Sequence, residues 1–491
     1  MGKGEAGRVG QRLAITLAFG SAAAVMVLEL VSLRLVAPYI GLTLETNTAV
    51  IGVALAAIAT GAALGGRFAD TVPPSKTLGP LILFAGALVM LILPVVRWTG
   101  EALRGEDSNF VFLVLAVTLF APAALLSAVT PMVTKLRLEN LAETGTVVGR
   151  LSAYATVGGI VGTVLTGFVF VAKTPISTIV LSLGGLLVVA GAVLTVVLRG
   201  ARAAVKPVAL ALVGATLTVV APRPCEVETA YHCARVVADP GREGGRTLYL
   251  DQLRHSYVDL NDPTYLEFDY IKNFAAAING SWPDKQPLDA LHVGGGGLTM
   301  PRYLTATRPG SKNQVYEIDG AVVELDKKEL GLRTGPDLGV TVRDGRLGVR
   351  DEATDSKDLV IMDAFSGLSV PWHLTTRELV ADVKRVMRPD GVYLVNVIDH
   401  GKALFAKAEI KTLQAEFAHV AVIATKDEFA GRTGGNFVLV GSDRPIDLGA
   451  IEAGLGPAME VRDQLTDFVG EAPVLTDDYA PVDQLLTPYA G

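Results

Sequence analysis

The chain has 491 residues, half of them hydrophobic and only 19% charged, with a net charge of −7 and a mean hydropathy of +0.42. The length exceeds that of one ordinary domain. The acidic balance gives no indication of nucleic-acid binding, which needs an excess of Lys and Arg, so we expect no nucleic-acid partner. The averages combine a first half with few charges (13–221) and a second half (223–491) that holds most of the Asp and Glu.

About seven stretches of the first half are long and apolar enough to cross a bilayer, which needs about 20 such residues. They lie near 13–36, 48–66, 78–96, 110–133, 151–171, 176–198 and 206–221. One water-soluble core has no room for seven such segments, so we expect a multi-span α-helical membrane domain over 1–221, with the lipid bilayer as its partner. The first stretch is too long for a secretory signal peptide, so we expect a retained helix.

Lys and Arg are concentrated in alternate short loops, and this bias predicts the orientation of the spans. With a cytoplasmic N-terminus, the inner loops hold Lys3, Arg8, Arg12, Arg67, Lys76, Lys135, Arg137, Arg150, Arg199, Arg202 and Lys206. The outer loops hold Arg34, Arg97, Arg104 and Lys173. Seven spans then place the C-terminal half outside the cytoplasm, whereas the loss of one span would place it inside.

Two runs of small residues, 61–65 and 158–162, offer faces for close helix packing inside the membrane domain. Glu29 is the one acid in the middle of the first span, where ionisable groups are often functional. It either serves a ligand or transport role or pairs with a neighbouring helix or with Arg34.

The junction between the halves contains the only two cysteines of the chain, Cys225 and Cys233. Two cysteines this close together, beyond a helix end predicted to face outward, favour a disulfide in an oxidising compartment. Free thiols are the alternative. We expect no metal site, because zinc requires four ligands at closer spacing and only His232 lies nearby.

Strand-like apolar runs alternate with helical runs in the second half, which predicts a doubly wound, Rossmann-like α/β sheet with parallel strands over 286–491. The runs lie at 288–293, 313–318, 339–342, 357–363, 391–397, 419–425 and 436–442, with a helix expected from Gly320. Ligands of such sheets bind beyond the carboxyl ends of the strands.

Candidate binding residues follow the first four of these strands. Gly294 and Gly296 permit a tight turn and the close approach of a ligand, and Glu317 is placed to accept hydrogen bonds from ribose hydroxyls. Asp344 and Asp363 follow the third and fourth strands. Asp363 can act as a general base or hold a cation, or it caps the following segment. Alternatively, this part of the chain has the fold of a nucleotide-binding domain but binds no ligand.

These motifs resemble those of the spermidine synthases, the polyamine aminopropyltransferases, and the whole chain looks like their membrane-fused bacterial relatives. The similar stretches are "EFDY" (267–270), "GGGGLT" (294–299), "YEID" (316–319), "DG" (344–345), "DAFSG" (363–367) and "LTDDYAPVD" (475–483). The resemblance implies a methyltransferase-type domain preceded by a small β-sheet, which "YHCARVV" and "RTLYLDQLRHSYVDL" fit, within a junction region over 222–285.

The resemblance also implies a reaction, in which an amine of putrescine attacks the aminopropyl carbon of decarboxylated S-adenosylmethionine and methylthioadenosine leaves. Asp363 is then the base and Tyr270 lines the amine site, while Glu317 and Asp344 hold the ribose and adenine of the donor. This donor is a co-substrate, and no permanently bound cofactor is expected.

The chain departs from the family pattern at several positions. Gly297 stands where the family has an acid that holds the amino end of the donor, and Leu298 and Thr299 replace two glycines. Ser366 replaces the second acid of the catalytic loop, and Ile271 replaces a Gln beside the Tyr.

These losses matter because a dicationic amine is held by paired carboxylates. The acids that can substitute are Asp477 and Asp478, expected to bind substrate, and also Asp262 and Asp269. The absence of the acid that holds the amino end of the donor would also suit a ligand that keeps its carboxylate, such as S-adenosylmethionine.

Two functions follow from the sequence. The first is a membrane-bound, spermidine synthase-like aminopropyltransferase. The second is a catalytically degenerate extracytoplasmic domain on a membrane bundle, which binds a polyamine or nucleoside as a sensor or in transport. A methyltransferase-like enzyme is a third option, and a homo-oligomer is compatible with each.

Overall fold

The computed structural model describes residues 10–41, 44–103, 108–138, 143–365, 367 and 369–486. Lys3, Arg8, Arg104 and Ser366, which the sequence singled out, lie outside the described residues. The chain forms two compact units, Met1–Cys233 and Ala234–Gly491. The predicted finer division at residues 221 and 285 stays a prediction.

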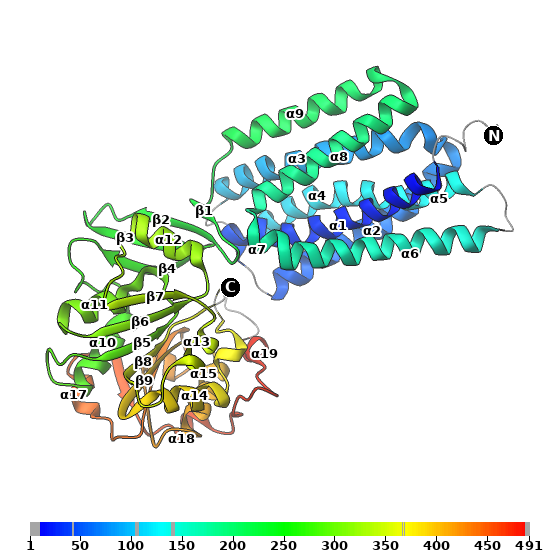
Figure 1. The fold of residues 1–491 in the computed structure, drawn as a ribbon. Coiled ribbons are helices and arrows are strands. Elements are labelled where there is room, and N and C mark those ends of the chain that lie inside the picture. The colour runs from blue at the N-terminus through cyan, green and yellow to red at the C-terminus, as the bar shows by residue number, and fades with distance from the viewer. Residues whose placement is uncertain are drawn as a thin grey trace. The chain divides into compact units, whose positions relative to one another are not determined.

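The first unit is a bundle of helices, most of them long and apolar (Figure 1). They are α1 (Gln11–Ile40), α2 (Leu44–Thr71), α3 (Pro74–Ala102), α4 (Ser108–Ser127), α5 (Val129–Arg137), α6 (Thr144–Leu165), α7 (Val171–Lys173), α8 (Ile176–Arg199) and α9 (Val205–Val220). Seven helical segments of the described chain are long and apolar enough to cross a membrane, and each predicted stretch overlaps one of them. The expected number of spans is therefore confirmed at the level of helix length and composition.

Small residues let several helices of the first unit touch backbone to backbone. A Cβ atom on Gly61 of α2 would collide with the carbonyl of Ala124 on α4, and one on Gly158 of α6 with the carbonyl of Phe19 on α1. Within a bilayer such close van der Waals packing is a main source of helix association, because lipid tails are as apolar as the side chains. Both runs of small residues thus lie at helix contacts.

The sequence offers a matched test of this packing at two adjacent glycines of α6. We expect Gly158→Ala to lower the apparent Tm of the detergent-solubilised full chain, because the added methyl group overpacks the contact with α1, at a cost of about 1–3 kcal/mol. A Cβ on Gly159 would lie 3.6 Å from Met26 Cγ, an ordinary contact. Gly159→Ala should therefore leave Tm unchanged or raise it through the higher helix propensity of Ala. Equal effects of the two variants would contradict the packing argument.

Glu29 makes no hydrogen bond or ion pair with any residue that the structure describes. Arg34, the partner considered for it, instead donates to the backbone carbonyls of Thr229 and Tyr231. The predicted Glu29–Arg34 pair is therefore not formed, because the guanidinium is occupied by the segment that follows α9.

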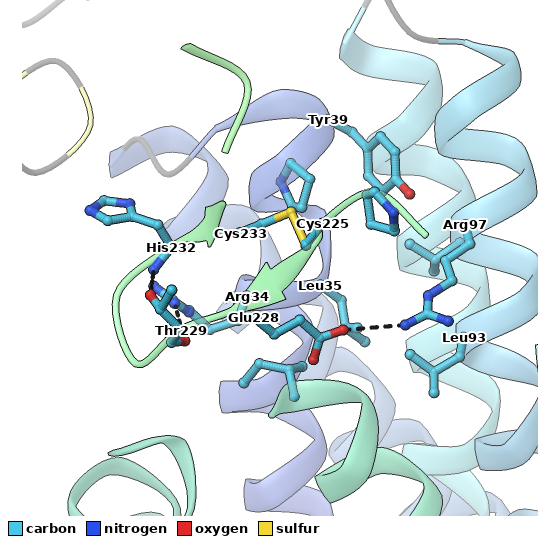
Figure 2. A pocket seen from close by; sticks show the side chains of 14 residues that line it. Arg34, Leu35, Tyr39, Leu93, Arg97, Cys225, Glu228, Thr229, His232 and Cys233 are labelled. Carbon is cyan, nitrogen blue, oxygen red and sulfur yellow. Dashed lines mark hydrogen bonds and ion pairs between the residues drawn. A yellow bond between two sulfur atoms is a disulfide. The ribbon is translucent and has the colours of Figure 1, made fainter. Parts of the chain in front are cut away.

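A small pocket lies at one end of the helices of the first unit (Figure 2). Helices α1, α3 and α8 and the segment after α9 contribute Arg34, Tyr39, Leu93, Arg97, Ile176, Glu228 and His232 to its lining. The Glu228 carboxylate accepts from Arg97 Nη2 at 3.2 Å and from the backbone N–H of Ser177 at 2.8 Å. Because Ser177 lies in the first turn of α8, the Glu228 charge also interacts favourably with that helix end.

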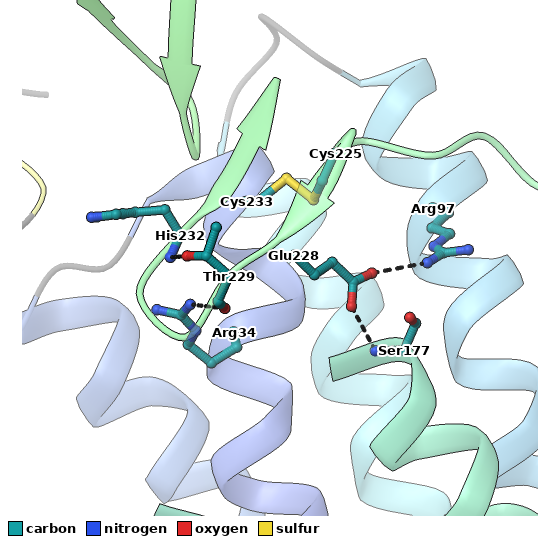
Figure 3. The surroundings of a disulfide bond; sticks show 8 residues. All are labelled: Arg34, Arg97, Ser177, Cys225, Glu228, Thr229, His232 and Cys233. Carbon is teal, nitrogen blue, oxygen red and sulfur yellow. Dashed lines mark hydrogen bonds and ion pairs between the residues drawn. A yellow bond between two sulfur atoms is a disulfide. The ribbon is translucent and has the colours of Figure 1, made fainter. Parts of the chain in front are cut away.

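The segment that carries Glu228 is closed into a loop by a disulfide between Cys225 and Cys233, whose Cα atoms are 5.1 Å apart (Figure 3). The loop contains the two-residue strand β1 (Val227–Glu228) and a turn in which the Thr229 N–H donates to the His232 carbonyl at 2.8 Å. Hydrogen bonds to Arg34 of α1, Arg97 of α3 and Ser177 of α8 fix the loop to three helices of the first unit.

The second unit begins with a small antiparallel sheet and a helix. The sheet pairs β2 (Cys233–Ala238) with β3 (Gly245–Leu250) and β3 with β4 (Leu253–Asp259), and α10 (Asp269–Ser281) follows. The small sheet implied by the family resemblance is thus present.

An eight-stranded sheet forms the centre of the second unit, in the order β12-β10-β11-β9-β8-β5-β6-β7. The strands are β5 (Asp289–Val293), β6 (Lys312–Glu317), β7 (Leu338–Val342), β8 (Lys357–Met362), β9 (Met387–Asp399), β10 (His419–Thr425), β11 (Gly435–Ser442) and β12 (Met459–Arg462). Strands β5 to β9 are parallel, as the alternating pattern predicted.

Helices cover both faces of this sheet (Figure 1). They are α11 (Thr299–Thr307), α12 (Gly320–Glu329), α13 (Gly345–Asp351), α14 (Arg377–Val386), α15 (Leu404–Gln414), α16 (Lys426–Phe429), α17 (Leu448–Glu452), α18 (Thr466–Val469) and α19 (Val482–Leu486). Leu359 and Ile361 of β8 pack in the core with α10 and α11, whereas Val360 and Met362 pack in the core with α14 and α15. Because both faces of the sheet are buried, successive residues of these strands are apolar, which explains the continuous apolar runs in the sequence.

The prediction of a fully parallel sheet is wrong for β10 and β11. Strand β11 runs antiparallel to β9, and β10 runs antiparallel to both β11 and β12. A parallel connection between neighbouring strands needs a crossover of about a dozen residues or more, usually with a packed helix. The segment 426–434 is shorter and contains only the one-turn α16, so β10 and β11 pair as a hairpin.

Candidate functional site

A glycine turn connects β5 to α11 at the carboxyl edge of the sheet. Gly294 has φ of 96°, and a Cβ atom there would collide with the carbonyl oxygen of Asp363. A Cβ on Gly296 would lie 2.6 Å from His255 Cδ2. Position 294 therefore requires glycine, whereas a side chain at position 296 would have to displace the His255 ring. The turn lies directly against Asp363, the residue that follows β8.

The carboxyl group of Asp363 is held between side chains from two elements. Tyr270 of α10 donates its hydroxyl to Asp363 Oδ2 at 3.2 Å, and Asn396 of β9 donates its amide to Oδ1 at 2.9 Å. Asn436 of β11 in turn donates to Asn396 Oδ1 at 2.9 Å. Desolvation by the surrounding protein raises the pKa of Asp363 to about 6, although both hydrogen bonds act in the opposite direction.

Asp363 lines a narrow cavity that is partly open to solvent. The glycine turn and the start of α11 form one wall, and α10 forms another. The polar side chains of the lining include Tyr270, Ser256 and His292. Burial lowers the pKa of His292 to about 4, so its ring is neutral at pH 7. Within the described ranges, no three His, Cys, Asp or Glu residues form a group able to hold a metal ion.

Glu317, proposed from the sequence to bind ribose, contacts the turn itself. Its Oε2 accepts from the Gly295 N–H at 2.7 Å, and its Oε1 accepts from the Asp319 N–H at 2.8 Å. The ribose role stays a prediction.

Asp326 of α12 is a buried acid at the site that the sequence analysis missed. Its Oδ2 accepts from the Gly297 N–H at 3.0 Å, and its Oδ1 has no partner among the described residues. Burial raises its pKa to about 8, and the nearby Glu317 charge adds to this shift. An available signal was its helical spacing from the core residues Val322 and Val323, which places an acid on an apolar face.

The raised pKa of Asp326 makes a pH-dependent contribution to stability. The folded chain keeps this proton up to about pH 8, whereas an unfolded Asp, with a pKa of about 3.9, has lost it above about pH 5. Because the folded state binds more protons in this window, its stability falls as pH rises from 5 to 8. Asp326→Asn keeps an acceptor for the Gly297 amide but does not titrate.

We therefore expect the apparent Tm of Asp326→Asn, relative to that of the unaltered chain, to become steadily more favourable between pH 5 and pH 8. Thermal melts of both full-length proteins in one detergent, over a pH series, measure this difference. A difference that does not change with pH would contradict the buried, protonated state.

Asp344 caps the helix that follows β7. Its Oδ1 accepts from the Leu347 N–H at 3.0 Å, and its Oδ2 lies 3.1 Å from His373 Nε2. His373 lies after β8, in a segment that the sequence analysis did not assign. The cap fixes the Asp344 carboxylate beside the sheet edge, and its proposed adenine contact stays a prediction.

The substitute acids named from the sequence lie outside the cavity of Asp363. Asp477 pairs with both terminal nitrogens of Arg346 at 2.7 and 2.6 Å and accepts from Thr376 Oγ1 at 2.8 Å. Asp269 pairs with Lys272 at 2.9 Å. Asp262 lies near Arg242, and Asp478 is exposed. None of these four lines the cavity of Asp363.

Comparisons with known proteins identify a family and several relatives that this chain resembles. The Spermine/spermidine synthase domain family matches residues 277–430. The polyamine aminopropyltransferase of Vibrio vulnificus is 27% identical over 148 residues, which are 30% of this chain and 48% of that one. The polyamine aminopropyltransferase of Pyrobaculum aerophilum is 32% identical over 158 residues, 30% of this chain and 51% of that one. The chain thus spans about half the length of these relatives.

A solved structure of a probable spermidine synthase from Corynebacterium glutamicum is 29% identical, covers 51% of this chain and 95% of its own, and has a TM-score of 0.48. The parallel sheet, its glycine turn and the acid after β8 define a Rossmann-like, methyltransferase-type α/β domain with a small β-sheet before it. With the family match and the named relatives, this C-terminal domain is spermidine synthase-like, as the sequence motifs indicated.

Proposed function

We propose that the C-terminal domain transfers an aminopropyl group from decarboxylated S-adenosylmethionine to an amine, with Asp363 as the base. The observation that carries the proposal is the Asp363 carboxyl itself. It lines a cavity beside the glycine turn, its pKa is raised to about 6, and Tyr270 and Asn396 fix its orientation. The relatives named polyamine aminopropyltransferases support the same reaction class.

The donor sulfonium is already an activated leaving group, so the protein mainly positions the substrates and receives a proton. A carboxyl with a pKa near 6 is ionised at neutral pH and is a stronger base than an ordinary Asp. In this proposal Tyr270 and Asn396 hold the carboxylate toward the amine. Gly294 and Gly296 let the donor approach the backbone, and Glu317 receives its ribose.

The titration of Asp363 predicts the pH dependence of the reaction. Below about pH 6 the carboxyl is protonated and cannot act as a base, so kcat/KM should fall about tenfold per pH unit on the acid side. Asp363→Asn should lower methylthioadenosine release from the donor and an amine that the unaltered chain accepts by about 10²-fold or more.

The matched control is Asp269→Asn, which removes an acid that is paired with Lys272 and does not line the cavity. This variant should keep near-normal rates. Methylthioadenosine release that survives Asp363→Asn would remove Asp363 from the mechanism.

The second candidate is a binding domain without catalysis. It is favoured by the engagement of Asp477 with Arg346, which removes one of the acids expected to bind substrate. Binding of a polyamine or nucleoside to the purified chain, with no methylthioadenosine released from any donor and amine, would establish this alternative.

We further propose a multi-pass membrane protein with a cytoplasmic N-terminus and an extracytoplasmic C-terminal domain. The apolar helices, the distribution of Lys and Arg, and the Cys225–Cys233 disulfide support this arrangement. An outside location would separate the domain from a cytoplasmic donor, so the location also bears on the choice between enzyme and binding domain.

Cysteine labelling in intact cells tests the orientation, since both native cysteines are in the disulfide. We expect Lys402→Cys, at an exposed position of the second unit, to react with a membrane-impermeant maleimide in intact cells. Lys76→Cys, in a predicted inner loop, should react only after permeabilisation. The reverse pattern would place the C-terminal domain in the cytoplasm.

A further inference from the structure

We propose that the amine acceptor of this domain is a monoamine with an apolar body, and not a diamine. The proposal rests on the aminopropyl transfer proposed above and names the class of its second substrate. The charge and polarity of the cavity wall around Asp363 carry it.

The cavity offers one anionic group to a ligand. Of the described residues that line it, Asp363 is the only carboxylate. The His292 ring is neutral at pH 7 and its Nε2 is engaged with Asn313 Oδ1 at 3.0 Å. Tyr270, Ser256 and Thr299 add only hydroxyl groups. Asp363 therefore offers an anionic partner to a single ammonium group of the acceptor.

Beside Thr299, Pro301 and the backbone of the glycine turn, four side chains of the lining are apolar and well buried. Ile271 of α10, Leu298 and Met300 beside the turn, and Ile361 of β8 are each no more than 6% exposed. These side chains suit an alkyl chain, whose burial is favourable. A second ammonium group of a diamine would lose its hydration against these side chains without gaining an anionic partner, which is unfavourable.

Acids next to the cavity are committed to the protein itself. Glu317 accepts the amide of Gly295, and Asp326 accepts the amide of Gly297 from within the core, where its raised pKa keeps it largely protonated at pH 7. Neither residue lines the cavity. The structure thus places no second carboxylate, among its described residues, along the cavity wall.

The reaction balances with one ammonium group and one carboxylate. The acceptor ammonium pairs with the Asp363 carboxylate and gives it one proton. The freed nitrogen lone pair forms the new C–N bond to the aminopropyl carbon. The C–S bond breaks, its electron pair stays on sulfur, and the product is a secondary ammonium plus neutral methylthioadenosine.

The test compares n-butylamine with 1,4-diaminobutane, which differ by the second amino group. Purified full-length protein in detergent is given decarboxylated S-adenosylmethionine and either amine, and kcat/KM is measured from methylthioadenosine release. Binding of each amine in the presence of methylthioadenosine is measured by calorimetry as a readout independent of catalysis. We expect the monoamine to be favoured at least tenfold in both measurements.

Two engineered acids test the reason for this preference. Ile271→Glu and Met300→Glu each add a carboxylate to the apolar wall, and their matched controls are Ile271→Gln and Met300→Gln, which add no charge. We expect at least one Glu variant to shift the ratio toward the diamine by tenfold or more. The Gln variants should weaken both amines to a similar extent and leave the ratio near that of the unaltered protein.

The outcomes separate this inference from the proposed function. Preference of the unaltered protein for the diamine, equal use of both amines, or binding of neither would overturn the monoamine assignment. Tighter binding of the monoamine without any methylthioadenosine release would support the assignment of the cavity and reject the aminopropyl transfer. Ratios unchanged by both Glu variants would also count against the apolar wall as the cause.

Discussion

The arrangement of the site depends on the close approach of the Gly294 backbone to the carbonyl oxygen of Asp363. Strands β5 and β8 are parallel neighbours in which Val293 pairs with Met362, so the chain leaves both strands at the same level. Only a residue without a side chain fits at position 294. This contact sets the glycine turn against the Asp363 carboxyl, and it thereby defines where a donor and an acceptor can meet.

Much of the fold could be predicted from the sequence because two patterns of apolar residues are strong in this chain. Long uncharged stretches predicted the helices of the first unit, and apolar runs separated by helical segments predicted strands β5 to β9. The antiparallel pairing of β10 and β11 was missed because both strands are as apolar as the parallel ones. Only the short connection at 426–434 distinguishes them from the parallel strands. The antiparallel pairing can therefore be predicted from the length of this loop, and not from hydrophobicity.

The candidate site was only partly accessible from the sequence. Asp363 and Tyr270 were named from local motifs, and they do lie within hydrogen-bonding distance of one another. The engagement of Asp477 with Arg346 and of Asp326 with Gly297 depends on residues far apart in the chain. Spacing along the sequence carries no information on such pairs, so an acid available for substrate cannot be told from one that is already satisfied.

The acids of the second unit therefore perform different physical tasks. One carboxyl, Asp363, faces a cavity with a raised pKa, whereas Asp344 caps a helix and Glu317 fixes a turn. What a ligand encounters in the cavity is determined by the one described carboxylate that lines it, and not by the acidic composition of the domain.

The disulfide loop has a consequence for the biosynthesis of the protein. Its partners Arg34, Arg97 and Ser177 all precede it in the chain, and its two cysteines are separated by only eight positions. Because a nascent chain emerges from its N-terminus, every group that the loop needs has been synthesised before β3. The first unit can thus complete its covalent closure while the ribosome is still translating the second, and its maturation does not wait for the folding of the sheet.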